Sequence, residues 1–132
     1  METKKDLSDY RLEQAGQCLK EAKLLFENGL FKGAANRSYY CVFHCMRSIF
    51  ALEGVDFKRH TGVIRSFREK YIKVGIFDLY MSDILTDLFQ VRTDSDYNDY
   101  YVINKNDVVK QIENAEYFLG QVKLYLNKEN VI

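Results

Sequence analysis

The chain has 132 residues, with nineteen basic and nineteen acidic side chains, so its formal charge is zero. This length fits a single domain, which we expect to span residues 1–132, and the 47% hydrophobic fraction excludes a disordered chain. Zero net charge excludes a protein that is basic overall and an acidic tail, but it leaves room for local patches of charge.

The first two predicted helices cover about residues 6–28 and 30–52. Apolar residues recur at three- and four-residue steps in the first of them, as on one face of an amphipathic helix. Asn28-Gly29 is a plausible end for this helix, because both residues tolerate the left-handed conformation. The second helix carries a wide apolar arc and ends near Gly54, which predicts that it lies at the centre of the fold.

Three further helices are predicted, over about residues 61–73, 77–91 and 106–126. Thr61 or His60 could cap the first of these, and Asn106 could cap the last. The stretch between the last two, residues 92–101, is polar, aromatic and poor in helix formers, so we expect an ordered loop there. With no proline and only seven glycines, the chain is predicted to be an all-α, antiparallel up-and-down helical bundle of four to five helices.

Several features predict a cytoplasmic protein. The N-terminus is charged and lacks the apolar segment of a signal peptide, and no apolar run reaches the roughly 18 residues of a membrane span. The three cysteines do not suggest a disulfide framework. Cys41 and Cys45 lie one helical turn apart, but we interpret them as small buried side chains rather than zinc ligands. We expect no metal and no cofactor.

Charge is segregated along the chain. Residues 58–73 hold six basic side chains and one acidic, whereas residues 78–99 hold six acidic and one basic. The two stretches could be solvated helix faces that attract each other within the bundle. Alternatively, the first could be a basic surface for phosphates near an acidic one.

A polar cluster is predicted on the second helix. Arg37, Tyr40 and His44 are spaced three and four residues apart, so they share one face, with Asn36 beside them and Arg47 continuing the row. Arginine can neutralise a phosphate and histidine can carry a proton near neutral pH. Together they could support phosphodiester cleavage. From spacing alone, a polar cluster that locks this helix to its neighbours is the better interpretation.

Two more clusters could carry chemistry. Arg92, Asp96, Tyr97 and Tyr100 lie in an acidic, aromatic stretch. Its carboxylates could bind a metal or pair with Arg92, and its tyrosines could stack on bases, accept a modification or anchor the core. The run Lys58-Arg59-His60 precedes a helix whose N-terminus is a natural anion site, although a histidine in such a place is more often structural.

Four segments in order resemble the HEPN family (higher eukaryotes and prokaryotes nucleotide-binding domains). They are residues 22–30, 34–44, 60–64 and 92–97. The most specific is Asn-Arg-Ser-Tyr-Tyr-Cys-Val-Phe-His, from Asn36 to His44. The resemblance covers nearly the whole chain and implies an antiparallel helical bundle that forms homodimers. It also implies a minimal nucleotidyltransferase as partner, a place in a toxin–antitoxin pair, and, in many members, metal-independent ribonuclease activity.

The ribonuclease motif that the resemblance implies is an arginine, four to six residues, then a histidine, placed late in the bundle at the dimer cleft. Arg37 and His44 have this spacing but lie on the second helix. Arg92 matches the motif's arginine by its order along the chain. Tyr97 follows after four residues, and the histidine is absent. Partners in some such pairs nucleotidylate a tyrosine near the motif, which here implies Tyr97 or Tyr100.

We therefore expect a protein that binds nucleotide or RNA phosphates and acts with a minimal nucleotidyltransferase. It could be the toxin (ribonuclease) half of a toxin–antitoxin pair. If it is an enzyme, it is a metal-independent endoribonuclease. The alternative is a non-catalytic nucleotide- or protein-binding module whose polar clusters are structural locks. The candidate catalytic residues are Arg37, His44 and Arg92. The candidate nucleotide- or RNA-binding residues are Asn36, Tyr40, Lys58, Arg59, His60, Asp96 and Tyr97.

Overall fold

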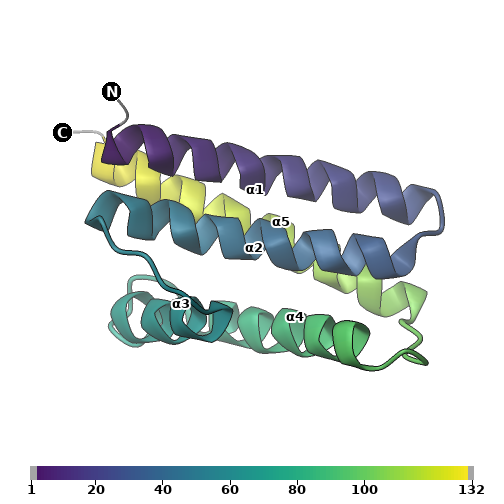
Figure 1. The fold of residues 1–132 in the computed structure, drawn as a ribbon. Coiled ribbons are helices and arrows are strands. Elements are labelled where there is room, and N and C mark those ends of the chain that lie inside the picture. The colour runs from purple at the N-terminus through teal and green to yellow at the C-terminus, as the bar shows by residue number, and fades with distance from the viewer. Residues whose placement is uncertain (1–2, 131–132) are drawn as a thin grey trace.

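Helices make up almost all of the computed structural model, which describes residues 3–130 and the side chains of residues 3–128. They are α1 (Lys4–Glu27), α2 (Phe31–Glu53), α3 (His60–Phe67), the π-helical turn η1 (Arg68–Ile72), α4 (Leu79–Tyr97) and α5 (Lys105–Asn130). Helices α1 and α4 run in one direction and α2 and α5 in the other (Figure 1). The predicted all-α antiparallel bundle is confirmed. Within residues 3–130, no helix has the length and apolarity needed to span a membrane.

Helices α1 and α2 form a tightly packed hairpin with the most extensive contact between any two helices. The turn between them uses Gly29 at φ +73°, in the left-handed region, so the predicted end of the first helix is confirmed. Small buried side chains let the helices approach closely, and Ser8 and Ser48 join them through hydroxyls 3.1 Å apart. Because one side of α2 packs against α1, the opposite side of α2 is the one left to contact the other helices.

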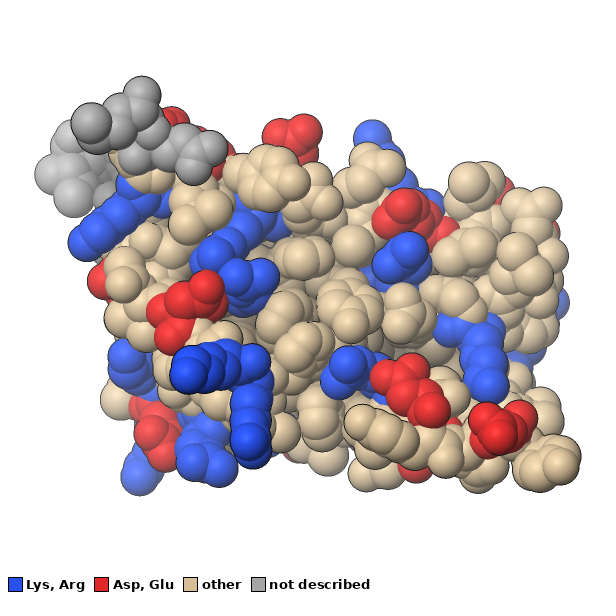
Figure 2. All heavy atoms as spheres, viewed as in Figure 1, with Lys and Arg blue, Asp and Glu red and all other residues tan. Residues whose placement is uncertain are grey.

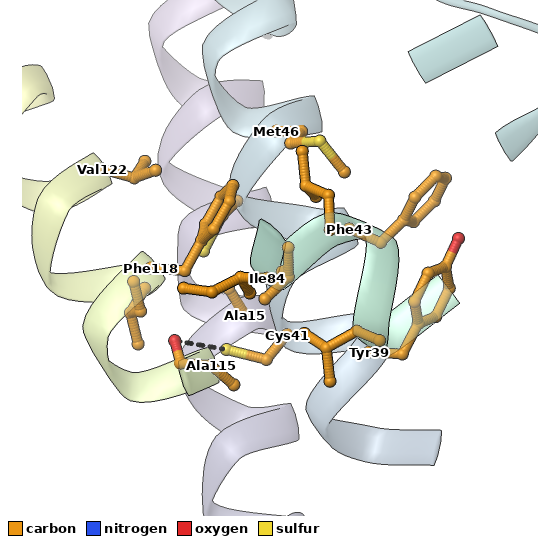
Figure 3. Close-up of a cluster of buried hydrophobic side chains, with 14 of the residues drawn as sticks. Ala15, Tyr39, Cys41, Phe43, Met46, Ile84, Ala115, Phe118 and Val122 are labelled. Carbon is orange, nitrogen blue, oxygen red and sulfur yellow. Dashed lines mark hydrogen bonds between the residues drawn. The ribbon is translucent and has the colours of Figure 1, made fainter. Parts of the chain in front are cut away.

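Helix α2 is the centre of the bundle, as its wide apolar arc predicts. Thirteen of its 23 residues are buried, and it contacts α1, α3, α4 and α5. In Figure 3, Phe118 and Val122 of α5 lie on one side of the core, while Tyr39 and Phe43 of α2 lie on the other. Tyr39 and Phe43 therefore lie on the side of this cluster opposite α5.

The three cysteines are free and buried, which confirms that they serve as small core side chains. Cys41 points at the backbone of α5, with its Sγ 3.9 Å from the carbonyl oxygen of Ala115 (Figure 3). Burial raises the pKa of the Cys18 thiol to about 11 and raises that of Cys45 well above its usual value. Thiols in this state are poor nucleophiles.

The two capping predictions are wrong. Arg59 occupies the N-cap of α3, and no side chain caps that helix. His60 is unavailable as a cap because its ring is turned into the bundle, where it stacks on Phe43. At the start of α5, the side-chain oxygen of Asn104, not Asn106, accepts a hydrogen bond, which the backbone N–H of Asn106 donates over 2.7 Å.

The loop predicted over residues 92–101 is wrong for residues 92–97, because α4 continues to Tyr97, and it is confirmed for residues 98–101. Interactions one helical turn apart support this extension: the Gln90 side chain donates to Asp94, and Arg92 pairs with Asp96. The polar composition of this segment indicated a loop, because composition alone takes no account of pairs of side chains one helical turn apart. The connection to α5 is therefore shorter than predicted, and Arg92 is held on a helix.

Candidate functional site

Helix α2 turns a polar stripe outward, formed by Arg37, Tyr40, His44 and Arg47. Their steps of three, four and three residues keep them on one helical face. None of the four is fully buried, whereas most of the residues between them are. The stripe lines an open groove of about 560 Å³ between α1 and α3. The other lining residues are Gln14, Cys18 and Glu21 of α1, Phe43 of α2 and His60 of α3.

Aromatic rings form the floor of the groove. His60 stacks on Phe43, with ring centroids 4.0 Å apart and planes inclined by 16°. The Tyr40 ring stands edge-on to His60 at 5.9 Å and lies 6.1 Å from His44. The Tyr39 hydroxyl lies beneath this layer, 2.7 Å from Nδ1 of His60. Both histidines of the chain thus belong to one ring cluster, although they come from different helices.

Arg92 joins the same cluster from α4. Its guanidinium carbon lies 5.2 Å from the centroid of the Tyr39 ring and 5.9 Å from that of Tyr40, within the range of cation–π attraction. Its Nε lies 3.5 Å from the carboxylate of Asp96. That nitrogen is buried and makes no well-aligned hydrogen bond, so the pair is held by charge. The structure brings Arg37 and His44 into the groove and places Arg92 against the groove's tyrosines.

Carboxylates already partner the arginines that border the groove. Arg37 lies 3.5 Å from Glu21 of α1. Arg47 lies 3.3 Å and Arg11 3.7 Å from Asp56, in the loop before α3. The Glu21 and Asp56 side chains are more than a third exposed, and pairs of this kind contribute only about 0–1 kcal/mol. Arg37, which is the most exposed of the three arginines, is therefore held loosely enough to exchange a carboxylate for another anion.

Both imidazoles favour the neutral form. Burial is the main reason why the pKa of His44 is lowered, and the charges of Arg47 and Arg11 lower it further. Burial also lowers the pKa of His60, with Arg92 adding to the effect. In addition, Nδ1 of His44 is buried without a hydrogen-bond partner. The groove thus holds two neutral bases among several positive charges.

The remaining predicted residues lie around or outside the groove. Lys58 and Arg59 are exposed in the loop that leads to His60, and Asn36 is half-buried beside Arg37. Tyr97 and Tyr100 are 85% and 92% exposed at the end of α4 and in the following turn. The tyrosines are therefore not core anchors, and they do not line the groove.

The segregation of charge is visible on the surface. Figure 2 shows Lys and Arg side chains gathered over α3 and the loop before it, and acidic side chains over the end of α4. Among the described side chains, no ion pair joins the two stretches. Arg68 instead binds hydroxyls of Ser82 and Thr86. Attraction between the two solvated faces and a basic surface for phosphates therefore both stay predictions.

Sequence reasoning missed the contribution of α1 and the role of Tyr39. Gln14, Cys18 and Glu21 line the groove from α1, and their spacing of four and three residues was a usable signal, since it puts them on one helical face. The bond between Tyr39 and His60 had no such signal, because the two residues are 21 positions apart and belong to different helices.

Comparisons with known proteins agree with this architecture. The model of the HEPN domain matches residues 8–125. The chain belongs to the HEPN family. It is 31% identical over 123 residues to a UPF0332 protein of Archaeoglobus fulgidus, an alignment that covers 93% of this chain and 98% of the relative. A UPF0332 protein of Thermotoga maritima is 28% identical, with 93% of each chain covered.

Another relative of this HEPN chain carries a functional name. A Methanocaldococcus jannaschii protein named "Putative toxin" is 24% identical over 121 residues, which is 92% of this chain and 82% of the relative. Membership of the HEPN family, which the resemblance predicted from four short segments, is thus confirmed over almost the full length.

The neutral histidines predict an acid-sensitive fold. We expect the free energy of unfolding to fall as the pH is lowered from about 7 to about 5. The unfolded histidines take up protons near pH 6.5, whereas the folded ones do so only at lower pH, so their stabilisation is present above about pH 6.5 and is lost as the pH falls towards the folded pKa values. Urea unfolding at the two pH values measures this loss.

A double variant, His44→Gln with His60→Gln, is the control for this prediction, because it removes both titrating groups. Its unfolding free energy should change less between the two pH values than that of the parent protein. An equal loss in the double variant would assign the acid sensitivity to carboxylates instead.

Proposed function

We propose that this HEPN protein is toxin-like and that the groove on α2 binds the phosphates of cytoplasmic RNA or of a nucleotide. The observation that carries the proposal is the lining of the groove, where Arg37 and Arg47 flank two neutral imidazoles and the Tyr40 ring. Arginine presents a planar fork of donors that suits phosphate oxygens. The relative named a toxin aligns with this protein over most of both chains, which supports the toxin-like part of the proposal.

The groove offers a second kind of contact for an RNA chain. The half-buried Tyr40 ring offers aromatic surface at the floor of the groove, and stacking of a base on such a ring contributes about 1–3 kcal/mol whatever the base. The exposed Lys58 and Arg59 lie beside His60 and extend the positive surface away from the groove. An RNA chain could thus place one phosphate in the groove and another against Lys58 and Arg59.

The alternative is a non-catalytic module in which the polar groups are structural locks. The pairing of Arg37 with Glu21 is the observation in its favour. However, both side chains are about two-fifths exposed, at 43% and 41%, and an exposed pair contributes only about 0–1 kcal/mol. Stability is therefore a weak reason for arginine at position 37, and phosphate binding is the better one.

Arginine variants test the phosphate site. For a fluorescently labelled single-stranded RNA, we expect Arg37→Gln and Arg47→Gln each to weaken binding by about tenfold or more, since a hydrogen bond to a charged group contributes about 1.5–3 kcal/mol. Fluorescence anisotropy measures the dissociation constant. Binding should also weaken as salt is raised, because phosphate contacts release counterions.

Arg65→Gln is the matched control for this experiment. Arg65 is an exposed arginine of α3 that lines a different hollow, between α3 and α4. Its substitution should leave the dissociation constant within about twofold of that of the parent protein. If Arg65→Gln weakened binding as much as the groove variants did, the RNA would be bound by the general basic surface and the proposed site would be wrong.

We also propose a minimal nucleotidyltransferase as the partner and a homodimer as the active form. The resemblance to paired HEPN proteins suggests both, and a solution mass equal to that of the monomer would contradict the dimer. Tyr97 and Tyr100 suit a modifying partner, because their rings project almost fully into solvent, with the exposed Asp96 and Asp99 next to them in the sequence.

Mass spectrometry tests the partnership. When the chain is incubated with ATP and a minimal nucleotidyltransferase, we expect its mass to rise by one or more nucleoside monophosphates. Tyr97→Phe combined with Tyr100→Phe should abolish the gain. Tyr101→Phe, a change at a half-buried neighbour, should not affect it. An unchanged gain in the double variant would exclude these two tyrosines as the target.

A further inference from the structure

The two histidines of the chain share the same pair of neighbouring rings. The centroid of His60 lies 4.0 Å from that of Phe43 and 5.9 Å from that of Tyr40. The centroid of His44 lies 6.0 and 6.1 Å from the same two rings. Both histidines also line the groove. One bound phosphodiester in the groove would therefore lie between two groups that can transfer protons.

The surroundings of the two imidazoles differ in a way that separates their roles. Burial raises the pKa of Tyr39, so its hydroxyl keeps its proton and can donate it to Nδ1 of His60 over 2.7 Å. Neutral His60 then carries its own hydrogen on Nε2. His44 has no partner on Nδ1, so its hydrogen can lie on either nitrogen, and it can present a free lone pair to the groove.

We propose that His44 and His60 are the catalytic acid–base pair of a ribonuclease, with His44 as the base, His60 as the acid and Tyr39 as the residue that positions His60. This inference rests on the proposed phosphate site and assigns its substrate as RNA, because the reaction uses the 2′-hydroxyl as nucleophile. In the motif that the resemblance implies, a histidine follows the arginine by a few residues. This inference assigns that histidine's role beside Arg92 to His60 of α3, which precedes Arg92 in the sequence.

The reaction balances without any further reactant. His44 takes the proton of the 2′-hydroxyl, the bond between O2′ and phosphorus forms, and the bond between phosphorus and O5′ breaks. Protonated His60 gives its Nε2 proton to the departing O5′. The products are a 2′,3′-cyclic phosphate and a 5′-hydroxyl. His44 ends protonated and His60 neutral, and proton exchange with water restores both.

The charges around the pair suit this chemistry. Arg11 of α1, Arg47 of α2 and Arg92 of α4 contribute positive charge near the imidazoles, which would stabilise the added negative charge on the phosphoryl oxygens as the bonds exchange. Asp56 and Asp96 face these arginines and keep them in place. The lowered pKa of His44 keeps it neutral, as a base must be, and the lowered pKa of His60 makes its protonated form a stronger acid.

Cleavage and binding can be measured separately. Cleavage uses an RNA oligonucleotide, between about pH 5 and pH 8, and binding uses the same oligonucleotide with 2′-deoxy sugars, which cannot react. We expect His44→Asn and His60→Asn to lower the cleavage rate by at least about 100-fold, while each binds the 2′-deoxy oligonucleotide within about twofold of the parent protein. Tyr39→Phe should lower cleavage without changing binding, whereas Tyr101→Phe should change neither.

A second substrate distinguishes the acid from the base. Replacing the leaving O5′ with sulfur gives a thiolate, which departs without being protonated. This substrate should restore cleavage by His60→Asn and Tyr39→Phe, but not by His44→Asn. A merely structural effect of Tyr39→Phe would not be restored by a change in the leaving group. Circular dichroism identifies any variant that fails to fold, and the glutamine variant then replaces the asparagine one.

The outcomes separate this inference from the proposed function. If the parent protein binds the 2′-deoxy oligonucleotide but cleaves no RNA across the pH range, the acid–base pair is wrong and the phosphate site stands. Cleavage at the parental rate by His44→Asn or His60→Asn would overturn the pair as well. So would rescue of His44→Asn by the thiolate substrate. If the parent protein binds no oligonucleotide, the proposed function itself fails.

Discussion

Burial of helix α2 on three sides is the constraint on which the rest of the structure depends. The apolar positions of α2 meet α1, α5 and the α3–α4 layer, and at about 1.5–3 kcal/mol for each large apolar side chain this burial dominates the stability of the bundle. One stripe of α2 is left uncovered by the other helices, and residues on that stripe cannot contribute much to the core. Arg37, Tyr40, His44 and Arg47 occupy it, so the helix that holds the bundle together also presents its polar groups.

The groove gains its chemistry from residues that the bundle brings together rather than from a local motif. His60 reaches the stripe because the loop after α2 returns the chain to it, and stacking on Phe43 holds the imidazole there. Arg92 reaches it because α4 runs past Tyr39. The HEPN ribonuclease motif places an arginine and a histidine close together late in the chain. This protein has Arg92 late in the chain, but its two histidines lie on α2 and α3. Tyr39, at the edge of the core, connects Arg92 to His60.

Much of the fold could be predicted from the sequence, because helix periodicity and the scarcity of turn residues are local signals. The central position of α2 followed from its apolar arc in the same way. The extension of α4 through Arg92 could not be predicted, since pairs such as Arg92 with Asp96 decide it and the polar composition indicated a loop. Spacing on one helix grouped Arg37 with His44, but no local pattern linked His60 or Arg92 to them. Those contacts depend on how the helices pack, which a single sequence does not contain.

A two-dimensional ¹H–¹⁵N NMR titration with the 2′-deoxy oligonucleotide locates the binding site on the protein without needing activity. We expect the largest shift changes on the backbone amides of α2 between Arg37 and Arg47 and on those around His60, with α5 unchanged. Shift changes confined to the hollow between α3 and α4, or to the turn around Tyr100, with the α2 stripe unaffected, would contradict the proposed site.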